Sequence, residues 1–536
     1  MKTIKITSAN GQSIISSLEG EQILLPEDAG AINDFQFQKV ENNVRYFIEI
    51  SPDKNFPINF GGIKIAMQIY FNHLNNNMMQ FEIVLFGFDS KESLFWHSIY
   101  SYFLKCSNVY YKQIEFNTKW IYPNNIKTID KKEAIEVLKN IGIKPPTSYQ
   151  SHHSITNEWS IFRWSSYLGI PTPLEKEVEN SLYFQYLKAI YEIDPIDSIK
   201  YFLVGKGKIL LIDDEEQKGW DAFFKRFKLP DDKNLKIKSI GREFKHLENK
   251  DLVIDQAIQE IKAFNPDVII LDLRLHDSDF DEHKPEELTG YSILEKIKNE
   301  INNGIQVILF SASNKIWNYQ ALAQIGFDGW ILKESPELSV DPHYTQNAVK
   351  DLKALIDHCL ERGYLKSIFK DIQELSIALG EKSYESNFLE MLKKQLKLSY
   401  YLLSKAENNE QFAYAYVSLY MVIEMINKEF ESEIVEECYR DKETNTYKFK
   451  PVERLTEWNK IAYLYFKKWM GTNNKFIRDL SFLITKRNGF VHNDRRILDK
   501  PTINKHGETV FLNHDIYKPE GFINLFGYIK KILNLL

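Results

Sequence analysis

The sequence has little cysteine and no long apolar run, and both absences exclude classes of protein. Its three cysteines, Cys106, Cys359 and Cys438, lie far apart and form no CxxC pair, so neither a disulfide framework nor a structural zinc site is expected. The start, MKTIKITSANGQSIISS, lacks the apolar core of a signal peptide. No later run approaches the roughly 20 apolar residues that cross a bilayer. We therefore expect a reduced, cytoplasmic protein with no membrane partner.

An excess of positive charge is also missing. The 68 Lys and Arg residues are outnumbered by 74 Asp and Glu residues, for a net charge of -6. The chain as a whole is therefore not an electrostatic partner for nucleic acid, and any site for a polyanion must be local. At 536 residues and 43% hydrophobic content, the length and composition favour three or four packed domains.

The first 200 residues combine strand-like and helical patterns. The runs VRYFIEI, FEIVLFGF and NVYYKQIEF alternate with helical stretches such as residues 131 to 141. We expect an α+β or α/β domain over 1–200, in which Trp159, Phe162 and Trp164 pack a core. No residues here form a defined site, so a sensing or partner-binding role follows only from position in the chain.

The middle and the last third of the chain follow two different patterns. Between 207 and 340, the apolar runs KILLID, LKIKSI, DVIILDL, QVILFSA and GWIL alternate with amphipathic helices, which predicts a doubly wound parallel sheet of five βα units. Helical patterns then follow almost without interruption, over 344–362, 366–379, 386–404 and 409–430. We expect 345–536 to form an all-α domain.

Polar residues follow the predicted strands of the middle domain. Asp213 and Asp214 end the first strand, Asp272 the third, Ser311 the fourth and Lys333 the fifth. The carboxyl ends of strands in an open parallel sheet converge on one crevice. Converging carboxylates repel one another, so the pattern predicts a divalent cation with oxygen ligands, Mg²⁺, held by the three aspartates. Asp272 is then placed as a nucleophile toward a phosphoryl group whose oxygens contact Ser311 and Lys333.

These motifs, ILLIDDEE, VIILDLRL, LFSAS and GWILKES, resemble those of the response-regulator receiver domain. The resemblance implies that Asp272 is the phosphoacceptor, that Trp330 is an aromatic switch residue, and that a histidine kinase or another signalling partner acts on the domain. Two features depart from the family. The family usually has a proline shortly after the lysine, but here Glu334 follows Lys333. The long insertion HDSDFDEHKPEELT separates Asp272 from Gly290, where the family has a glycine soon after the phosphoacceptor. A degenerate receiver that only binds partners is therefore an alternative. The insertion is interpreted first as a solvated acidic loop. The alternatives are that its acids disturb the metal site or that they create a contact surface; these acids are Asp277, Asp279, Asp281 and Glu282.

The string FLITKRNGFVHNDRR, from residue 482 to 496, is the most distinctive motif of the C-terminal domain. It resembles the arginine–polar–histidine motif of HEPN domains, which are helical bundles that often cleave RNA without a metal. The resemblance implies catalytic roles for Arg487, Asn488 and His492 and pairing of two copies as a homodimer. Lys486, Arg495 and Arg496 supply local positive charge for RNA. Glu424 is interpreted as a structural partner for an arginine.

The leading hypothesis is a signalling effector of a prokaryotic antiviral defence or toxin-like system. In it, phosphorylation of Asp272, or binding of a partner, controls a metal-independent HEPN endoribonuclease. The alternative is a non-enzymatic adaptor whose helical bundle dimerises or binds protein. A DNA-binding output is disfavoured because the chain shows no helix-turn-helix followed by a basic recognition helix. The activator, the RNA target and the direction of control stay open.

Overall fold

The structure is a computed structural model. It describes the chain apart from residues 26–39, 52–60, 98–99, 116–117, 121, 123–124, 144, 146–151, 171–180, 192–199, 283, 313–324, 342, 442, 445, 454 and 492–515. The chain divides into two compact units, one of residues 1–294 with 307–360 and one of residues 295–306 with 361–536. The predicted domain limits at 200, 207, 340 and 345 stay predictions.

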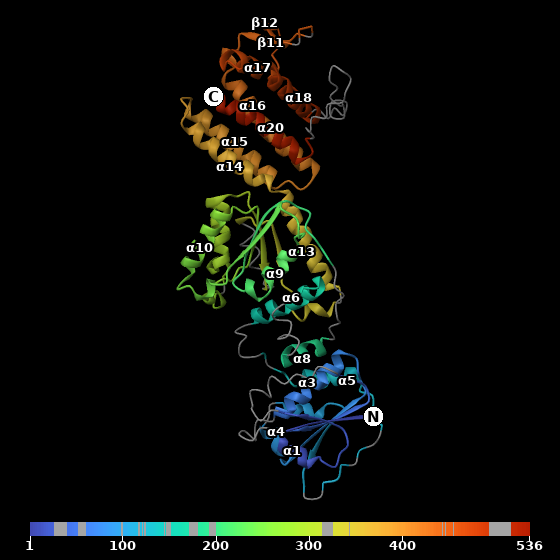
Figure 1. Cartoon of the computed structure of the whole chain (residues 1–536). Helices are drawn as coiled ribbons and strands as arrows, with labels where there is room; N and C mark the ends of the chain where they lie inside the picture. Colours follow the sequence, from blue (N-terminus) through green and yellow to red (C-terminus); the bar gives the residue numbers. More distant parts are fainter. Residues whose placement is uncertain are drawn as a thin grey trace. The chain divides into compact units, whose positions relative to one another are not determined.

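A five-stranded parallel sheet organises the N-terminal residues (Figure 1). Its strands are β1 (Lys2–Thr7), β2 (Glu21–Leu24), β3 (Val44–Glu49), β4 (Phe81–Gly87) and β5 (Val109–Gln113). They pair in the order β2-β1-β3-β4-β5, and every pair is parallel. Every residue of β4 is buried, as expected for a central strand covered on both faces. Of the two predicted classes, α+β and α/β, the sheet is α/β.

Helix α3 (Gly61–Asn75) is buried along most of its length. Gly62 lets it begin against β3, since a Cβ at this position would lie 2.0 Å from the backbone oxygen of Glu49. Helix α8 (Leu182–Ile190) packs beside α3, and Asn75 donates to the backbone oxygen of Gln185. The described residues of this part also form the helices α1 (Ala9–Ile14), α4 (Lys91–His97), α5 (Lys131–Lys139) and α6 (His152–Leu168).

The predicted doubly wound sheet of the middle region is confirmed. Its strands are β6 (Gly207–Ile212), β7 (Leu235–Ile240), β8 (Val268–Leu271), β9 (Gln306–Ser311) and β10 (Gly329–Leu332). Their order is β10-β9-β8-β6-β7. Numbered within its own region, this is the same order as in the N-terminal sheet, with the first strand between the second and the third. The chain thus repeats one topology without an evident repeat in its sequence.

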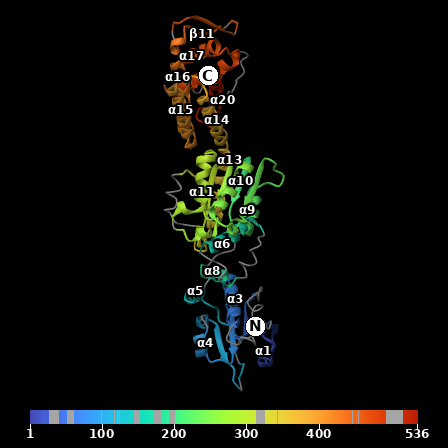
Figure 2. The same ribbon diagram turned by 90° about the vertical axis from the view of Figure 1, so that its left-hand side faces the viewer.

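Helices cover both faces of this second sheet. Figure 1 shows α10 (Lys250–Phe264) on one side of the strands and α13 (Tyr344–Glu361) on the other. Helices α9 (Trp220–Arg226) and α11 (Thr289–Lys296) also belong to the described residues of this region. Figures 1 and 2 both place α6 beside α9. The indoles of Trp159 and Trp164 are fully buried, so the predicted core role of these residues is confirmed.

The C-terminal unit is rich in helices, as predicted, but it is not all-α. Its helices are α14 (Tyr364–Gly380), α15 (Ser386–Ser404), α16 (Asn409–Glu429), α17 (Glu457–Tyr463), α18 (Asn474–Val491) and α20 (Pro519–Leu535). An antiparallel hairpin of β11 (Glu436–Arg440) and β12 (Tyr447–Pro451) corrects the prediction. The charged residues of EECYR and YKFKP hid the strand pattern, although Cys438 faces Phe449 on a buried side.

The three cysteines are buried free thiols. Among the described residues, no helix is long and apolar enough to span a membrane.

Candidate functional site

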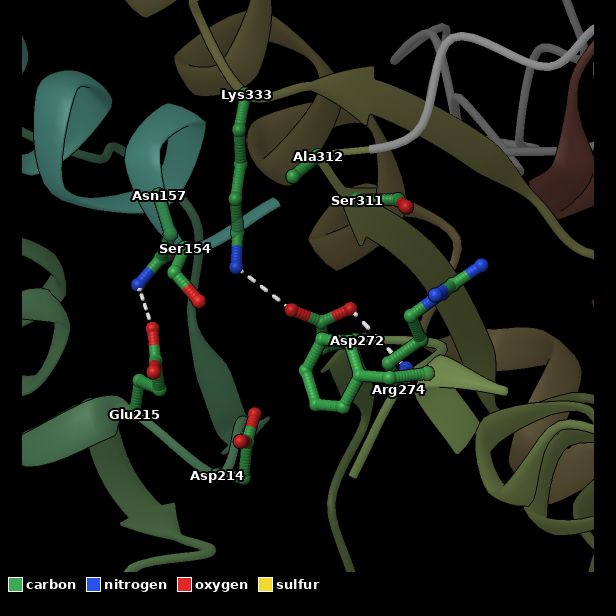
Figure 3. Close-up of a pocket in the computed structure, with 10 residues that line it drawn as sticks. Ser154, Asn157, Asp214, Glu215, Asp272, Arg274, Ser311, Ala312 and Lys333 are labelled. Atoms are coloured by element: carbon green, nitrogen blue, oxygen red, sulfur yellow. Dashed lines mark hydrogen bonds and ion pairs between the residues drawn. The ribbon is translucent and has the colours of Figure 1, made fainter. Parts of the chain in front are cut away.

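The second sheet brings the predicted site residues together at the carboxyl ends of its strands. Carboxylate oxygens of Asp213, Asp214 and Asp272 all lie within 4.8 Å of one another. Asp214, Asp272, Ser311 and Lys333 line one small cavity (Figure 3). These residues lie as far as 120 positions apart in the chain, and only the parallel strand order makes them neighbours.

Lys333 is the central cation of this site. Its Nζ lies 2.6 Å from Oδ2 of Asp272 and 3.0 Å from Oδ2 of Asp213. The lysine is only 2% exposed and Asp213 is fully buried. Burial opposes the charge of Lys333, but the two carboxylates outweigh it and raise the lysine's pKa. Burial also raises the pKa of Asp213 and outweighs the attraction of Lys333. One ammonium group therefore balances two buried acids.

A second cation supports the acidic pair from the other side. The Nζ of Lys245 lies 2.8 Å from Oδ2 of Asp214 and 2.7 Å from Oε1 of Glu215. Burial, followed by the charge of Asp213, raises the pKa of Asp214 to about 8. Burial would raise the pKa of Glu215 as well, but Lys218 and Lys245 outweigh it and lower that pKa. The charged form of Glu215 is thus stabilised by two lysines. At Asp214, by contrast, the charge of Lys245 does not offset burial and the charge of Asp213.

The donor set fits a hard divalent cation. Three carboxylates converge on one point, and carboxylate oxygens with retained waters are the ligands that Mg²⁺ prefers. The Oδ1 of Asp272 accepts a hydrogen bond from the backbone nitrogen of Arg274 at 3.3 Å, while its Oδ2 faces Lys333. Both oxygens of the predicted phosphoacceptor are therefore held in fixed directions (Figure 3).

Ser311 and Trp330 occupy different surroundings. Ser311 ends β9, is 5% exposed and lines the same cavity as Asp272. Trp330 lies on the edge strand β10 and is 48% exposed. It lines a groove with Tyr344 and Leu355 of α13, so the predicted switch residue faces away from the acidic cavity.

The insertion after Asp272 is not simply a solvated acidic loop, which corrects the interpretation of its sequence. Asp279 is fully buried. Its carboxylate accepts hydrogen bonds from the backbone nitrogens of Leu275, His276 and Thr289, at 2.9, 3.1 and 3.1 Å. It also lies 3.0 Å from Nζ of Lys250. The insertion is folded around this one acid.

Sequence reasoning missed Glu215 and Lys245 on the acidic side of the site, and it also missed residues of α6. Ser154 and Asn157, both on α6, line the cavity beside Asp272. Glu334, noted only as a departure from the expected proline, is fully buried and contacts the same helix. Its position directly after Lys333 was the only signal in the sequence.

The C-terminal motif is described in part. Arg487 and Asn488 lie in the last turns of α18, and an Arg487 nitrogen lies 2.7 Å from Oε1 of Glu424 on α16. The guanidinium also lies 4.7 Å from the ring centre of Tyr420. Glu424 is thus an ion-pair partner, as its structural interpretation requires. Lys486 lies on the same helix, whereas His492, Arg495 and Arg496 lie outside the described residues.

No family model matches this chain, and no curated protein is similar to it by sequence. Some solved structures are similar to parts of it. A two-component response regulator of the LuxR family from Aurantimonas is 14% identical over 28% of this chain and 86% of its own, with a TM-score of 0.19. The signal receiver domain of a modulated diguanylate cyclase from Desulfovibrio desulfuricans is 12% identical over 28% and 98%, with a TM-score of 0.17. NtrX from Brucella abortus is 13% identical over 60% and 66%, with a TM-score of 0.21. The interpretation of the site therefore rests on its own residues and distances.

Proposed function

We propose that this protein is a signalling regulator in which residues 207–340 form a receiver domain that accepts a phosphoryl group on Asp272. The observation that carries the proposal is the convergence of three carboxylates with Lys333 at the ends of β6, β8 and β10. The carboxylates attract a cation, and the bound cation together with Lys333 attracts an anionic group. A histidine kinase or another signalling partner is the proposed phosphoryl donor.

The chemistry follows from the residues present. A carboxylate oxygen of Asp272 attacks the phosphorus of the donor and a new O–P bond forms. The bond from phosphorus to the leaving group breaks, and its electron pair goes to the leaving group. Lys333 already lies within hydrogen-bond distance of Asp272, so it can follow the charge onto the phosphoryl oxygens, and Ser311 can donate its hydroxyl to them. A Mg²⁺ ion held by Asp213, Asp214 and Asp272 would neutralise part of the phosphoryl charge.

The test is the intact mass of the full-length protein after incubation with acetyl phosphate and Mg²⁺. We expect wild type to gain the mass of one phosphoryl group and Asp272→Asn to gain none. Asp281→Asn is a matched control, because Asp281 is an exposed acid of the nearby insertion, and it should be modified like wild type. A wild-type chain that never gains mass, while a known receiver does so under the same conditions, would refute the proposal.

For the output, we propose a HEPN-type endoribonuclease in the C-terminal unit, in a prokaryotic defence or toxin-like system. His492 would move the proton of the RNA 2′-hydroxyl, Arg487 would hold the phosphate, and Asn488 would orient either group, without a metal. Lys486, Arg495 and Arg496 would attract RNA, and a homodimer would face two motifs toward each other. The ion pair of Arg487 with Glu424 supports this proposal because it fixes the arginine at the end of α18.

The same ion pair also fits the second candidate, a receiver-gated adaptor without ribonuclease activity, since Arg487 then simply joins α18 to α16. Cleavage of labelled single-stranded RNA separates the two. Metal-independent cleavage that is lost in His492→Ala and in Arg487→Ala, with the helical content intact, would establish the ribonuclease. Cleavage that changes after incubation with acetyl phosphate would connect it to Asp272. Equal inactivity of wild type and both variants, with and without the phosphodonor, favours the adaptor.

A further inference from the structure

Helix α6 contributes to the cavity around Asp272 although it precedes the whole β6–α13 region in the sequence. Ser154 and Asn157, from the first two turns of α6, line the cavity together with Asp272 and Lys333 (Figure 3). A domain limited to the five βα units would lack both side chains. The site therefore draws on a helix outside the receiver-like fold.

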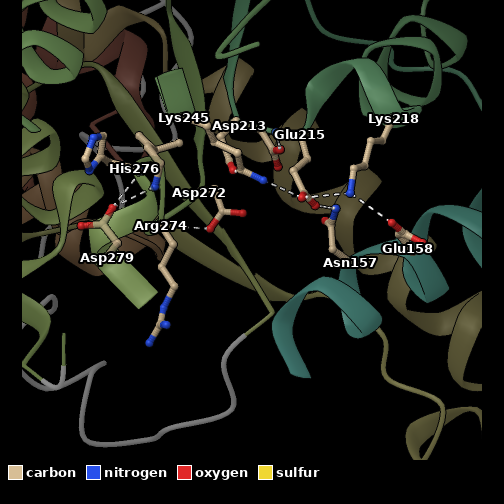
Figure 4. Close-up of polar contacts among 12 residues, drawn as sticks. Asn157, Glu158, Asp213, Glu215, Lys218, Lys245, Asp272, Arg274, His276 and Asp279 are labelled. Atoms are coloured by element: carbon tan, nitrogen blue, oxygen red, sulfur yellow. Dashed lines mark hydrogen bonds and ion pairs between the residues drawn. The ribbon is translucent and has the colours of Figure 1, made fainter. Parts of the chain in front are cut away.

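Asn157 joins α6 to the acidic side of the site. Its side chain is buried, with 4% of the residue exposed. The amide nitrogen donates to the carboxylate of Glu215, and the amide oxygen accepts from the indole nitrogen of Trp220 at 2.8 Å. Both polar ends of one small side chain are thus used by residues that follow β6, and Figure 4 shows the contact with Glu215. The amide satisfies a buried acid and a buried indole at once.

Glu215, the acid that Asn157 holds, is directly connected to the two predicted metal ligands. Its backbone nitrogen donates to Oδ1 of Asp213 at 2.8 Å. Its carboxylate shares the ammonium group of Lys245 with Asp214. A displacement of the Glu215 carboxylate therefore redistributes the counter-charge of Asp214. Where the backbone of Glu215 shifts with it, Asp213 also loses a hydrogen-bond donor.

Glu334 fastens α6 on the opposite side of the site. Its Oε2 accepts from the indole nitrogen of Trp164 at 2.8 Å, and its backbone oxygen accepts from the hydroxyl of Ser160 at 2.8 Å. The guanidinium nitrogen Nε of Arg163 lies 3.7 Å from its other oxygen. Glu334 directly follows Lys333, so α6 is attached next to the acidic pair at one end and next to the catalytic lysine candidate at the other.

We propose that α6 contributes to the function of the phosphoacceptor site and that Asn157 is its positioning residue. Asn157 holds Glu215, and thereby keeps Asp213 and Asp214 in the geometry that binds the cation. The inference rests on the proposed receiver function. Residues that hydrogen-bond or orient the ligands of a metal tune the affinity for that metal. Losing one such residue typically weakens metal binding by about 10- to 100-fold. Asn157 should have an effect of this size although it touches no ligand of the cation.

The experiment uses the full-length chain and two substitutions at one position. Asn157→Asp keeps the shape and the acceptor for Trp220 but turns the donation to Glu215 into repulsion between two acids. Asn157→Leu removes both hydrogen bonds. Ser166→Ala is the control on the same helix, because nine residues of α-helix place Ser166 on roughly the opposite face from Asn157, where its hydroxyl bonds only the backbone oxygen of Phe162. Mg²⁺ binding is measured by calorimetry, and hydrogen exchange of residues 152–168 reports whether α6 stays docked.

We expect Mg²⁺ binding to weaken by about tenfold or more in both Asn157 variants and to stay unchanged in Ser166→Ala. If either Asn157 variant binds Mg²⁺ like wild type, whether α6 stays protected or becomes exposed to exchange, Asn157 does not position the site and the inference is wrong. Wild-type protein that binds no Mg²⁺ refutes the proposed function itself, and the inference with it. An unchanged far-ultraviolet circular dichroism spectrum of a variant excludes a general loss of folding. One folded Asn157 variant is enough for the comparison with wild type.

Discussion

The ammonium group of Lys333 lies 2.6 Å from the carboxylate of Asp272 and 3.0 Å from that of Asp213. All three groups are almost completely buried. A charge that is removed from water is stable only when it is paired, because its lost hydration must be replaced. The lysine that would contact the phosphoryl group therefore also holds the acidic site together before the reaction.

Replacing Lys333 by methionine should destabilise the protein strongly. The substitution leaves two buried carboxylates facing each other without their shared cation, which typically costs about 3–5 kcal/mol. Urea unfolding in Mg²⁺-free buffer measures this loss. Adding Mg²⁺ should restore part of the stability, since the cation would replace the missing positive charge.

The double variant Asp272→Asn with Lys333→Met provides the control for this explanation. It removes one of the two unpaired acids, so it should unfold at higher urea concentration than Lys333→Met alone. Equal or lower stability of the double variant would show that packing of the lysine side chain, rather than charge, dominates.

The sequence predicted the central sheet and the members of its site for a clear physical reason. Buried parallel strands read as short apolar runs, and the residues directly after them must meet at one edge. Asp213, Asp272 and Lys333 could thus be placed together without a structure.

Asn157 and Glu334 could not be placed in this way. Asn157 is 58 residues from Glu215, and Trp164 is 170 residues from Glu334, so no local pattern joins them. The repeated strand order of the two sheets was also hidden, because topology depends on pairing and not on periodicity. The β11–β12 hairpin escaped prediction because each strand has only five residues and at least two of them are charged.

Asp279 should be the most sensitive acid of the insertion. Replacing it by alanine leaves three backbone nitrogens, those of Leu275, His276 and Thr289, without their acceptor and leaves Lys250 without its buried partner. The expected loss of stability is about 3 kcal/mol or more. Thermal unfolding tests this, with Asp281→Ala as an exposed control expected to change stability by less than about 0.5 kcal/mol. Similar small effects of both substitutions would restore the interpretation of a solvated loop.

His73 should make the N-terminal sheet sensitive to acid. Its Nδ1 must donate to the backbone oxygen of Met78 at 2.9 Å, so its Nε2 accepts from the hydroxyl of Tyr46 at 3.0 Å. Burial lowers its pKa from 6.5 to about 4. The unfolded chain therefore binds the proton more tightly than the folded one. The contribution of neutral His73 to the free energy of unfolding is therefore fully present above pH 6.5. It is lost as the pH falls toward 4, by roughly 3 kcal/mol.

Pulse proteolysis of the N-terminal residues in urea, at several pH values between 4 and 7, measures this dependence. In His73→Gln the midpoint should depend less on pH over the same range. An identical pH dependence in both proteins would assign the acid sensitivity to other groups.

Arg487 and Glu424 should be coupled energetically. Their charged groups lie 2.7 Å apart and are partly exposed, with 19% and 34% of the side chains accessible. Solvent screening limits such a pair to about 1 kcal/mol. A double-mutant cycle with Glu424→Gln and Arg487→Gln measures the coupling in urea unfolding. A coupling near zero would mean that the pair does not join α16 to α18.

The most direct test of the central claim is the chemical identity and position of the phosphoryl group after incubation with radiolabelled acetyl phosphate and Mg²⁺. An aspartyl phosphate is a mixed anhydride, so neutral hydroxylamine should release the label, and peptide mapping before release should place it on the peptide that contains Asp272. The account predicts hydroxylamine-sensitive label at about one group per chain in wild type and none in Asp272→Asn. Label that resists hydroxylamine, or that persists in Asp272→Asn, would contradict it.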